Sequence, residues 1–417
     1  MTDLTSYASP YNWMALSAKL PKKPRAVAIH DLTLEGDGEE MAGTRLSEAD
    51  RITIAKRVAE IGVGRLAILG YSPMPSAEDI RCAEKIMALE LPVQLDAFVK
   101  SKEEIDIAKG VGLSSVEILV NVNDARLPRG KAGAHIIDRC KTLAGHSKQQ
   151  GLHTCLMAMD ATRTRPEFLQ EVITALEPYC DEFTIGDSKG AISPYGLSLL
   201  LELVAGWTNK AVQVHLHNHS SMAVANALAS VLAGASTIQT TVNGLGELTG
   251  LVPLEEFAVA AQMHLGVTTG VDLAGLKGLS DFVARVFGMS LPIQKPAVGD
   301  GAFALPETEE IQQTYWELYQ EGRIEQAFTY PPRLVGNRYH MSIGPRCNTY
   351  TVLYNLAVLG WTCDEATVRD IVVAVRNEMA ARRGYALMGE DEFLDLVRKG
   401  GFDLGPLLRP SHFNSPE

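Results

Sequence analysis

The sequence predicts an α/β protein, a (β/α)8 TIM barrel followed by a mostly helical C-terminal accessory region. Eight short apolar runs rich in Val and Ile recur through the first two thirds of the chain, and longer segments with a helical period separate them. Nearly continuous apolar strands separated by helices indicate a parallel sheet that is covered on both faces. Eight such units before residue 266 match the closed barrel.

The predicted strands span 25–31, 64–70, 93–99, 115–121, 152–160, 182–187, 211–217 and 236–242. The predicted helices span 47–61, 76–89, 102–110, 131–150, 165–178, 193–203, 221–234 and 253–265. The first helix begins with Ser47 as N-cap and Asp50 three residues later, which is a capping-box pattern. An open doubly wound sheet fits less well, because no GxGxxG follows the first strand.

Three segments are expected: an N-terminal extension (1–24), the barrel (25–265) and a helical region (266–417). In the last of these, helical periodicity marks 273–287, 307–319, 348–359, 364–383 and 390–399, with Pro- and Gly-rich connectors between them. We expect this region to act as a lid, a dimerisation element, or both.

The composition is that of a soluble globular protein. The chain has 417 residues, a formal net charge of −12 and 46% hydrophobic residues. The acidic balance argues against binding to DNA or RNA, and no apolar stretch is long enough to span a bilayer. Six cysteines without a CxxC pair indicate reduced thiols. We therefore expect a cytoplasmic protein that acts on small molecules.

Histidines mark the end of the seventh predicted strand, where a barrel places its active site. Side chains alternate between the two faces of a strand, so His215 and His217 lie on one face of this strand, and His219 does as well if the strand continues. Two imidazoles at this spacing can share one divalent ion with a carboxylate. The first strand leads into an acidic loop, EGDGEE at 35–40, which could supply that carboxylate.

Two further strands end in polar residues at the same edge. The sixth leads into Asp187, Ser188 and Lys189, and the eighth leads into a Gly-rich turn with Asn243 and Glu247. Asn243 and Glu247 could supply oxygen ligands or hydrogen bonds. A metal held by these strand ends would polarise a 2-oxo acid or stabilise an enolate.

At these positions the sequence resembles the DRE-TIM metallolyase superfamily. The strand-seven motif reads HLHNHSSMAVANALASVLAGA (215–235), the next block reads TVNGLGEL (241–248), and MDATRT (159–164) and DSKG (187–190) follow two earlier strands. Two later segments look like the subdomain that follows the barrel in the synthase branch: KPAVGDGAF (295–303) and YPPRLVGNRYHMSIG (330–344). Several ordered motifs fall on the expected strands, and together they cover nearly the whole chain.

The resemblance implies a divalent ion (Zn, Mn or Mg) held by Asp37, His215 and His217, with Asn243 close by. Glu35 is the alternative ligand, because the first motif carries one extra residue. It also implies acyl-CoA as a cosubstrate, a carbon–carbon bond-forming acyltransferase of the isopropylmalate or homocitrate synthase type, and a homodimer. The related lyases, which cleave such bonds, are the second possibility.

The departures from the family pattern shape the remaining expectations. The first motif reads DLTLEGDGEE and has no arginine, and HND has become HNH through His219. Lys189 or His219 could replace the missing positive charge or transfer protons. The candidate catalytic residues are therefore Lys189, His219, Glu247 and Arg163, and the candidate substrate-binding residues are Asp187 and Ser188. A non-catalytic binding subunit and Schiff-base chemistry at Lys189 stay open as alternatives.

Overall fold

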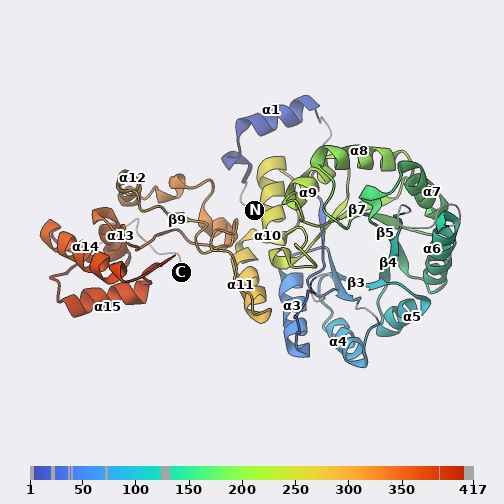
Figure 1. Cartoon of the computed structure of the whole chain (residues 1–417), viewed down its shortest axis with the longest axis horizontal. Coiled ribbons are helices and arrows are strands. Elements are labelled where there is room, and N and C mark those ends of the chain that lie inside the picture. The colour runs from blue at the N-terminus through green and yellow to red at the C-terminus, as the bar shows by residue number, and fades with distance from the viewer. Residues whose placement is uncertain are drawn as a thin grey trace. The chain divides into compact units, whose positions relative to one another are not determined.

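The computed structural model describes residues 4–19, 24–35, 38, 41–70, 74–123, 132–384 and 386–407. Its main feature is a closed barrel of eight strands in sequence order, with each strand parallel to the next and β8 pairing with β1. Figure 1 shows the helices arranged outside the ring of strands. The predicted (β/α)8 barrel with a helical C-terminal region is confirmed.

The barrel strands and helices lie close to their predicted positions. The strands are β1 (Ala28–Asp31), β2 (Arg65–Leu69), β3 (Gln94–Val99), β4 (Ser115–Asn121), β5 (His153–Met159), β6 (Glu182–Asp187), β7 (Ala211–Leu216) and β8 (Thr237–Thr240). The helices are α3 (Glu48–Glu60), α4 (Ala77–Met87), α5 (Lys102–Val111), α6 (Ala132–Gln149), α7 (Pro166–Leu176), α8 (Pro194–Ala205), α9 (Ala223–Leu232) and α10 (Leu254–Ala260), with α1 (Pro10–Lys19) before the barrel. Ser47 caps α3 with both capping-box hydrogen bonds to Asp50, as predicted.

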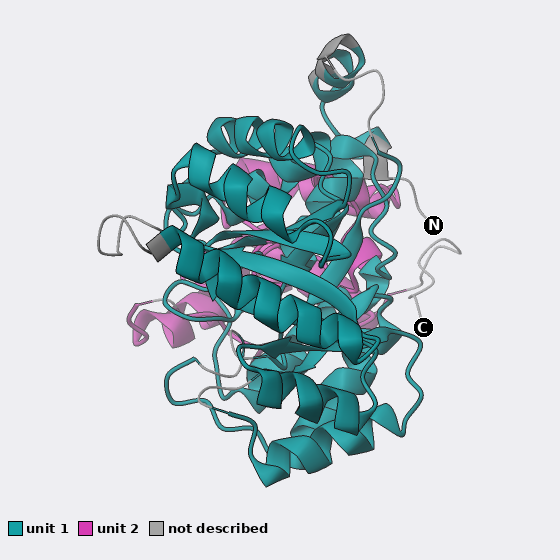
Figure 2. Ribbon diagram, turned by 90° about the vertical axis from the view of Figure 1, so that its right-hand side faces the viewer, with its two compact units in different colours: residues 1–292 teal, residues 293–417 magenta. Residues whose placement is uncertain are grey.

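The chain forms two compact units, residues 1–292 and 293–417, which Figure 2 shows in different colours. The break lies between 292 and 293, later than the predicted change of domain between 265 and 266. The reason is α11 (Leu276–Val286), which packs against α3 and the short helix Val242–Gly244. The sequence turns helical at 266, but the first helix of that region belongs to the barrel unit.

The second unit has its own core. It contains α12 (Glu309–Gln320), α13 (Thr349–Val358), α14 (Glu365–Ala380), α15 (Glu390–Gly400) and the two-residue strands β9 (Ala304–Leu305), β10 (His340–Met341), β11 (Trp361–Thr362) and β12 (Gly405–Pro406). Ile371, Val375 and Phe393 are buried between its helices. In the described part of the chain, no helix has the length and apolar character needed to cross a membrane.

Two layers of side chains fill the middle and the mouth of the barrel. The middle layer is polar, and its fully buried members are His30, Asp96, Glu117, Gln213 and Gln239. An apolar cluster lies next to it, toward the C-terminal ends of the strands, and consists of Leu32, Ala67, Phe98, Leu119, Met157 and Leu251. This arrangement gives the mouth of the barrel an apolar wall above a polar interior.

Candidate active site at the C-terminal ends of the barrel strands

A cavity of about 190 Å³ lies where the barrel strands end. Its lining residues are Glu35, Phe98, Lys100, Leu119, Asn121, Met157, Met159, Asp160, Ser188, Lys189, His215, His217 and Glu247. Phe98, Leu119 and Met157, from β3, β4 and β5, supply an apolar wall, and charged or polar residues at the ends of the other strands β1, β6, β7 and β8 also line the cavity. The cavity thus brings together six of the residues singled out from the sequence: Glu35, Ser188, Lys189, His215, His217 and Glu247.

The two histidines at the end of β7 face each other. The Nε2 atoms of His215 and His217 are 3.2 Å apart, and both side chains are buried. Burial, together with the neighbouring His215, His219 and Lys189, lowers the pKa of His217 from 6.5 to about 3. His217 is therefore neutral at physiological pH, the state in which an imidazole can donate a lone pair.

The pair of nitrogens fits a divalent ion. Two imidazole nitrogens can bind one zinc ion at about 2.0–2.1 Å, with an angle of roughly 90–110° between the bonds. The two nitrogens then lie about 2.8–3.4 Å apart. The observed 3.2 Å between His215 and His217 falls inside this range. Two neutral imidazoles beside a carboxylate are a donor set typical of zinc, iron and manganese sites.

Glu35 is the carboxylate of the cavity lining that follows β1, where the sequence predicts the third ligand. It follows β1, is buried, and lines the cavity together with His215 and His217. Gly70, at the end of β2, makes room for it: a Cβ atom there would lie 2.8 Å from the Cβ of Phe98 and 3.1 Å from Oε1 of Glu35. Asp37, the other candidate ligand, lies outside the described residues.

The turn after β6 is held in place by Asp187. Its Oδ1 accepts hydrogen bonds from the Thr162 hydroxyl at 2.6 Å and from the backbone N–H of Ala191 at 3.0 Å. Asp187 is fully buried beneath the turn, whereas Ser188 and Lys189 reach the cavity. Gly190 has a φ of +52°, and a Cβ there would lie 2.7 Å from the backbone nitrogen of His219. The DSKG motif therefore brings this turn against the end of β7.

Arg163 is engaged in an ion pair with Asp160. Its Nε and Nη2 donate to the two carboxylate oxygens of Asp160 at 2.7 and 2.6 Å. Asp160 lines the cavity, but Arg163 is not among the lining residues. The hydrogen bonds with Asp160 raise the pKa of Arg163, so its positive charge balances this buried carboxylate.

Asn243 and His219 lie apart from the cavity lining. The side chain of Asn243 hydrogen-bonds with the carbonyl and the hydroxyl of Ser280 on α11, and its backbone N–H donates to Glu255 at 3.0 Å. His219 is exposed, and its ring centroid is 6.0 Å from that of His217. The structure thus brings neither the Asn243 amide nor the His219 ring into the cavity.

Lys100 and Asn121 line the cavity and were missed in the sequence. Asn121 is the last residue of β4, and Lys100 directly follows β3. Their positions in the sequence could have identified them as site residues, because both stand where a predicted strand ends. A second positive charge, Lys100, therefore accompanies Lys189 at the mouth of the barrel.

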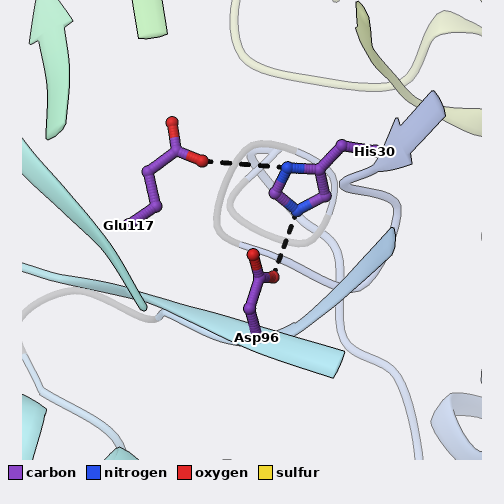
Figure 3. A group of neighbouring side chains, drawn as sticks. All are labelled: His30, Asp96 and Glu117. Atoms are coloured by element: carbon purple, nitrogen blue, oxygen red, sulfur yellow. Dashed lines mark hydrogen bonds and ion pairs between the residues drawn. The ribbon is translucent and has the colours of Figure 1, made fainter. Parts of the chain in front are cut away.

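A second group of titratable side chains lies deeper in the barrel. His30, Asp96 and Glu117 have ligand atoms within 4.8 Å of one another, the one such group of three among the described residues. Figure 3 shows the two carboxylates at opposite nitrogens of the ring, with Asp96 Oδ1 3.1 Å from Nε2 and Glu117 Oε2 3.7 Å from Nδ1. One ion bonded to either nitrogen would not reach both carboxylates, so this arrangement fits an imidazolium between two anions.

The charges of this deeper group depend on one another. Burial opposes a charge on His30, but Asp96 and Glu117 outweigh it and raise the pKa of His30 above its ordinary value. Burial raises the pKa of Glu117, while His30 and the donors around the carboxylate act in the opposite direction. No sequence motif marks this group, because its members come from three different strands, β1, β3 and β4.

Comparisons with known proteins agree with the fold and the motifs. The chain is 30% identical over 362 residues to the 2-isopropylmalate synthase of Sulfolobus acidocaldarius, covering 85% of this chain and 91% of that protein. It is 28% identical over 361 residues to the homocitrate synthase AksA of Methanothermobacter thermautotrophicus, covering 85% and 88%. Among solved structures, the HMG-CoA lyase of Bacillus subtilis shares the fold, with a TM-score of 0.58, 18% identity, and coverage of 65% of this chain and 96% of that one.

The family model described as HMGL-like matches residues 26–283. This match spans the whole barrel, from β1 to α11, and includes every residue that lines the cavity. The histidine pair at the end of β7 and the DSKG turn after β6 both lie within this match. The chain therefore belongs to the HMGL-like family, the DRE-TIM superfamily that its motifs indicated.

Proposed function

We propose that the chain is a metal-dependent acyltransferase that forms a carbon–carbon bond between an acyl-CoA and a 2-oxo acid. The observation that carries this proposal is the pair of Nε2 atoms 3.2 Å apart, in a cavity that also holds Lys100, Lys189 and Glu247. The relatives named isopropylmalate and homocitrate synthase support this reaction class.

His215 and His217 would hold the metal ion, with Glu35 or Asp37 as the carboxylate ligand. Zn, Mn and Mg are the candidate ions, and the two imidazoles favour Zn or Mn. Such an ion polarises the keto oxygen of a 2-oxo acid as a Lewis acid. The Asn243 amide would support this site indirectly, because its side chain is bonded to Ser280 of α11.

Several of the lining residues are suited to bind the 2-oxo acid. Lys100 can pair with its carboxylate, and the wall of Phe98, Leu119 and Met157 can take its alkyl part. The Ser188 hydroxyl oxygen accepts the backbone N–H of Asp160 at 2.9 Å, which leaves its own hydrogen to donate to a substrate oxygen. Asp187 would act by holding the turn that presents Ser188 and Lys189.

Glu247 is the proposed base that takes a proton from the α-carbon of the acyl group. The resulting carbanion attacks the keto carbon, the new alkoxide takes up a proton, and water then cleaves the thioester to release CoA with a free thiol. Lys189 would stabilise the enolate oxygen of the acyl donor, because it lines the cavity and carries the charge that the first motif lacks. His219, farther out, would exchange protons with solvent, and Arg163 would act through Asp160.

We also propose that the protein forms a homodimer, to which the helical region contributes. Support for self-association comes from the barrel unit: Tyr195, Leu199 and Leu203 on α8 are exposed by 90%, 58% and 41%. They are spaced four residues apart and so form one apolar stripe on the helix surface. Light scattering at micromolar concentration should give twice the mass of the chain, and a monomer would contradict the proposal.

The reaction is tested by measuring free thiol released from a panel of acyl-CoAs and 2-oxo acids, with and without a chelator. We expect turnover with at least one pair of substrates, and loss of turnover when the metal is removed. Cleavage of a 3-hydroxy acid or its CoA ester without any condensation would favour the lyase. A protein that turns over no substrate in either direction would favour a binding subunit.

The metal site is tested by elemental analysis of purified variants. We expect one divalent ion per chain in the wild type and none in a His215→Ala, His217→Ala double variant. Glu35→Gln and Asp37→Asn then distinguish the two candidate carboxylates, since only the true ligand should lower the metal content. Full occupancy in the double histidine variant would place the metal elsewhere.

A further inference from the structure

A line of hydrogen bonds joins His215 to the deep polar layer of the barrel. The Nδ1 of His215 lies 2.8 Å from Oε1 of Gln239. The Nε2 of Gln239 lies 3.0 and 2.8 Å from the two carboxylate oxygens of Glu117. These residues come from β7, β8 and β4, and all three are buried. A side chain of the proposed metal site thus connects directly with the middle of the barrel.

Glu117 determines which way the Gln239 amide faces. The oxygen and nitrogen of an amide have nearly the same shape, so their hydrogen-bond partners decide the orientation. The Thr184 hydroxyl and the Gln213 amide also donate to Glu117, and the His30 ring stands beside it (Figure 3). A carboxylate surrounded by donors accepts from all of them, so Gln239 turns its NH₂ group to Glu117 and its oxygen to His215.

The orientation of the amide fixes the hydrogen on His215. Because Oε1 of Gln239 can only accept, Nδ1 of His215 must donate. A neutral imidazole that carries its hydrogen on Nδ1 has its lone pair on Nε2. That Nε2 is the atom 3.2 Å from Nε2 of His217, in the residue pair that lines the cavity. The deep layer therefore leaves the lone pair of His215 where a metal ion would bind.

We infer that Gln239 is a positioning residue that holds His215 in the Nδ1–H tautomer, and that Glu117 in turn holds Gln239. The inference rests on the proposed metal-dependent function. Partners of this kind around a metal-binding histidine typically change metal affinity by about 10- to 100-fold when they are removed.

Gln213 offers a matched control for Gln239. It is the same residue type, is fully buried, and also donates to Glu117, at 3.2 Å. Its other contacts are the Cys155 sulfur at 3.1 Å and Nδ1 of His30 at 3.4 Å. A Gln213→Met variant should therefore disturb the deep layer about as much as Gln239→Met, while the acceptor for His215 stays in place.

The experiment compares wild type, Gln239→Met, Gln213→Met and Gln239→Glu. ¹⁵N NMR of histidine-labelled, metal-free protein reports the tautomer of His215, and competition titration with Co²⁺ or Zn²⁺ reports metal affinity. We expect the Nδ1–H tautomer in the wild type and in Gln213→Met, but a mixture in Gln239→Met. Metal affinity should fall about 10- to 100-fold in Gln239→Met and by less than about threefold in Gln213→Met. Gln239→Glu keeps an acceptor and should keep the tautomer.

Each result decides one point. An Nε2–H tautomer in the wild type would overturn the inference, as would equal losses of metal affinity in Gln239→Met and Gln213→Met. If Gln239→Met does not fold, the tautomer of Gln239→Glu decides: loss of the Nδ1–H form there also overturns it. If the wild type binds no divalent ion, the metal proposal fails by itself, and the tautomer measurement still tests the role of Gln239.

Discussion

The polar side chains in the middle of the barrel and those at its mouth differ in where their hydrogen bonds go. In the middle, His30 lies between Asp96 and Glu117, and Gln213 and Gln239 donate to Glu117. At the mouth, Lys189 and Glu247 line a cavity of about 190 Å³. A buried polar group that is satisfied within the protein supports the structure, whereas one that faces a cavity is available to a ligand.

This difference separates two groups that a search for metal ligands would treat alike. The His30 group has three ligand atoms close together, but its ring nitrogens are already occupied by carboxylates on opposite sides. The His215–His217 pair has its two Nε2 atoms turned toward each other beside the cavity. The direction of the nitrogens, and not their number, distinguishes an ion-pair network from a metal site.

The largest expected effect comes from removing a carboxylate of the middle layer. Asp96→Ala would leave His30 and Arg65 without the anion that lies 3.1 Å from the ring and 3.9 Å from the guanidinium. Removing one partner of a buried ion pair typically costs about 3–5 kcal/mol. We expect this decrease in the free energy of unfolding, measured by urea denaturation in the presence of a chelator.

The chain contains a matched surface pair for comparison. His146 and Asp106 are 2.7 Å apart, but the Asp106 side chain is 53% exposed. Exposed ion pairs contribute about 0–1 kcal/mol, so Asp106→Ala should have little effect on stability. Equal losses in Asp96→Ala and Asp106→Ala would show that the middle layer is not the stabilising feature described here.

The next largest effect is expected at the mouth, in catalysis and not in stability. Lys189→Ala should lower kcat by roughly 100- to 1,000-fold with little change in KM, because its charge would act mainly in the transition state. His219→Ala should have a smaller effect, since His219 is exposed and lies outside the cavity lining. An unchanged melting temperature is the control for folding. Wild-type kcat in both variants would point to Lys100 as the source of the positive charge.

The fold and the histidine pair could be predicted because both depend on local patterns. Alternating apolar runs and capped helices predict the barrel, and the HxH spacing places His215 and His217 on one face of β7. The C-terminal ends of parallel strands meet at one edge, so Ser188 and Lys189 were also expected at the cavity. These inferences need only the direction of a strand and the position at which it ends.

The remaining features depend on contacts between distant segments. Asn243 has a backbone φ of +64°, and its side chain bonds to Ser280, which lies on α11 and far along the sequence. The middle layer draws one residue from each of β1, β3, β4, β7 and β8, and no shared sequence motif links these five residues. Only the register of the closed barrel shows that these residues meet.

Asp31 belongs to neither group, and it provides the smallest of the expected effects. Its Oδ1 accepts the backbone N–H of Thr33 at 3.0 Å, whereas its buried Oδ2 has no hydrogen-bond partner among the described residues. Burial raises the pKa of Asp31 from 3.8 to about 6, with the Thr33 hydrogen bonds acting in the opposite direction and Glu255 adding to the increase. Between pH 3.8 and about 6, the folded protein thus holds a proton on Asp31 that the unfolded chain has already lost.

The sign of the pH dependence follows from this raised pKa. Its contribution to stability is fully present below pH 3.8 and is lost as the pH rises through about 6. Above that pH the loss amounts to at most about 3 kcal/mol. Asp31→Asn keeps the acceptor for Thr33 but cannot ionise. We therefore expect the variant to match the wild type near pH 4 and to be more stable, by about 1–3 kcal/mol, at pH 8. Urea denaturation between these pH values, with a chelator present, measures the difference, and parallel curves for the two proteins would show that Asp31 stays ionised in the fold.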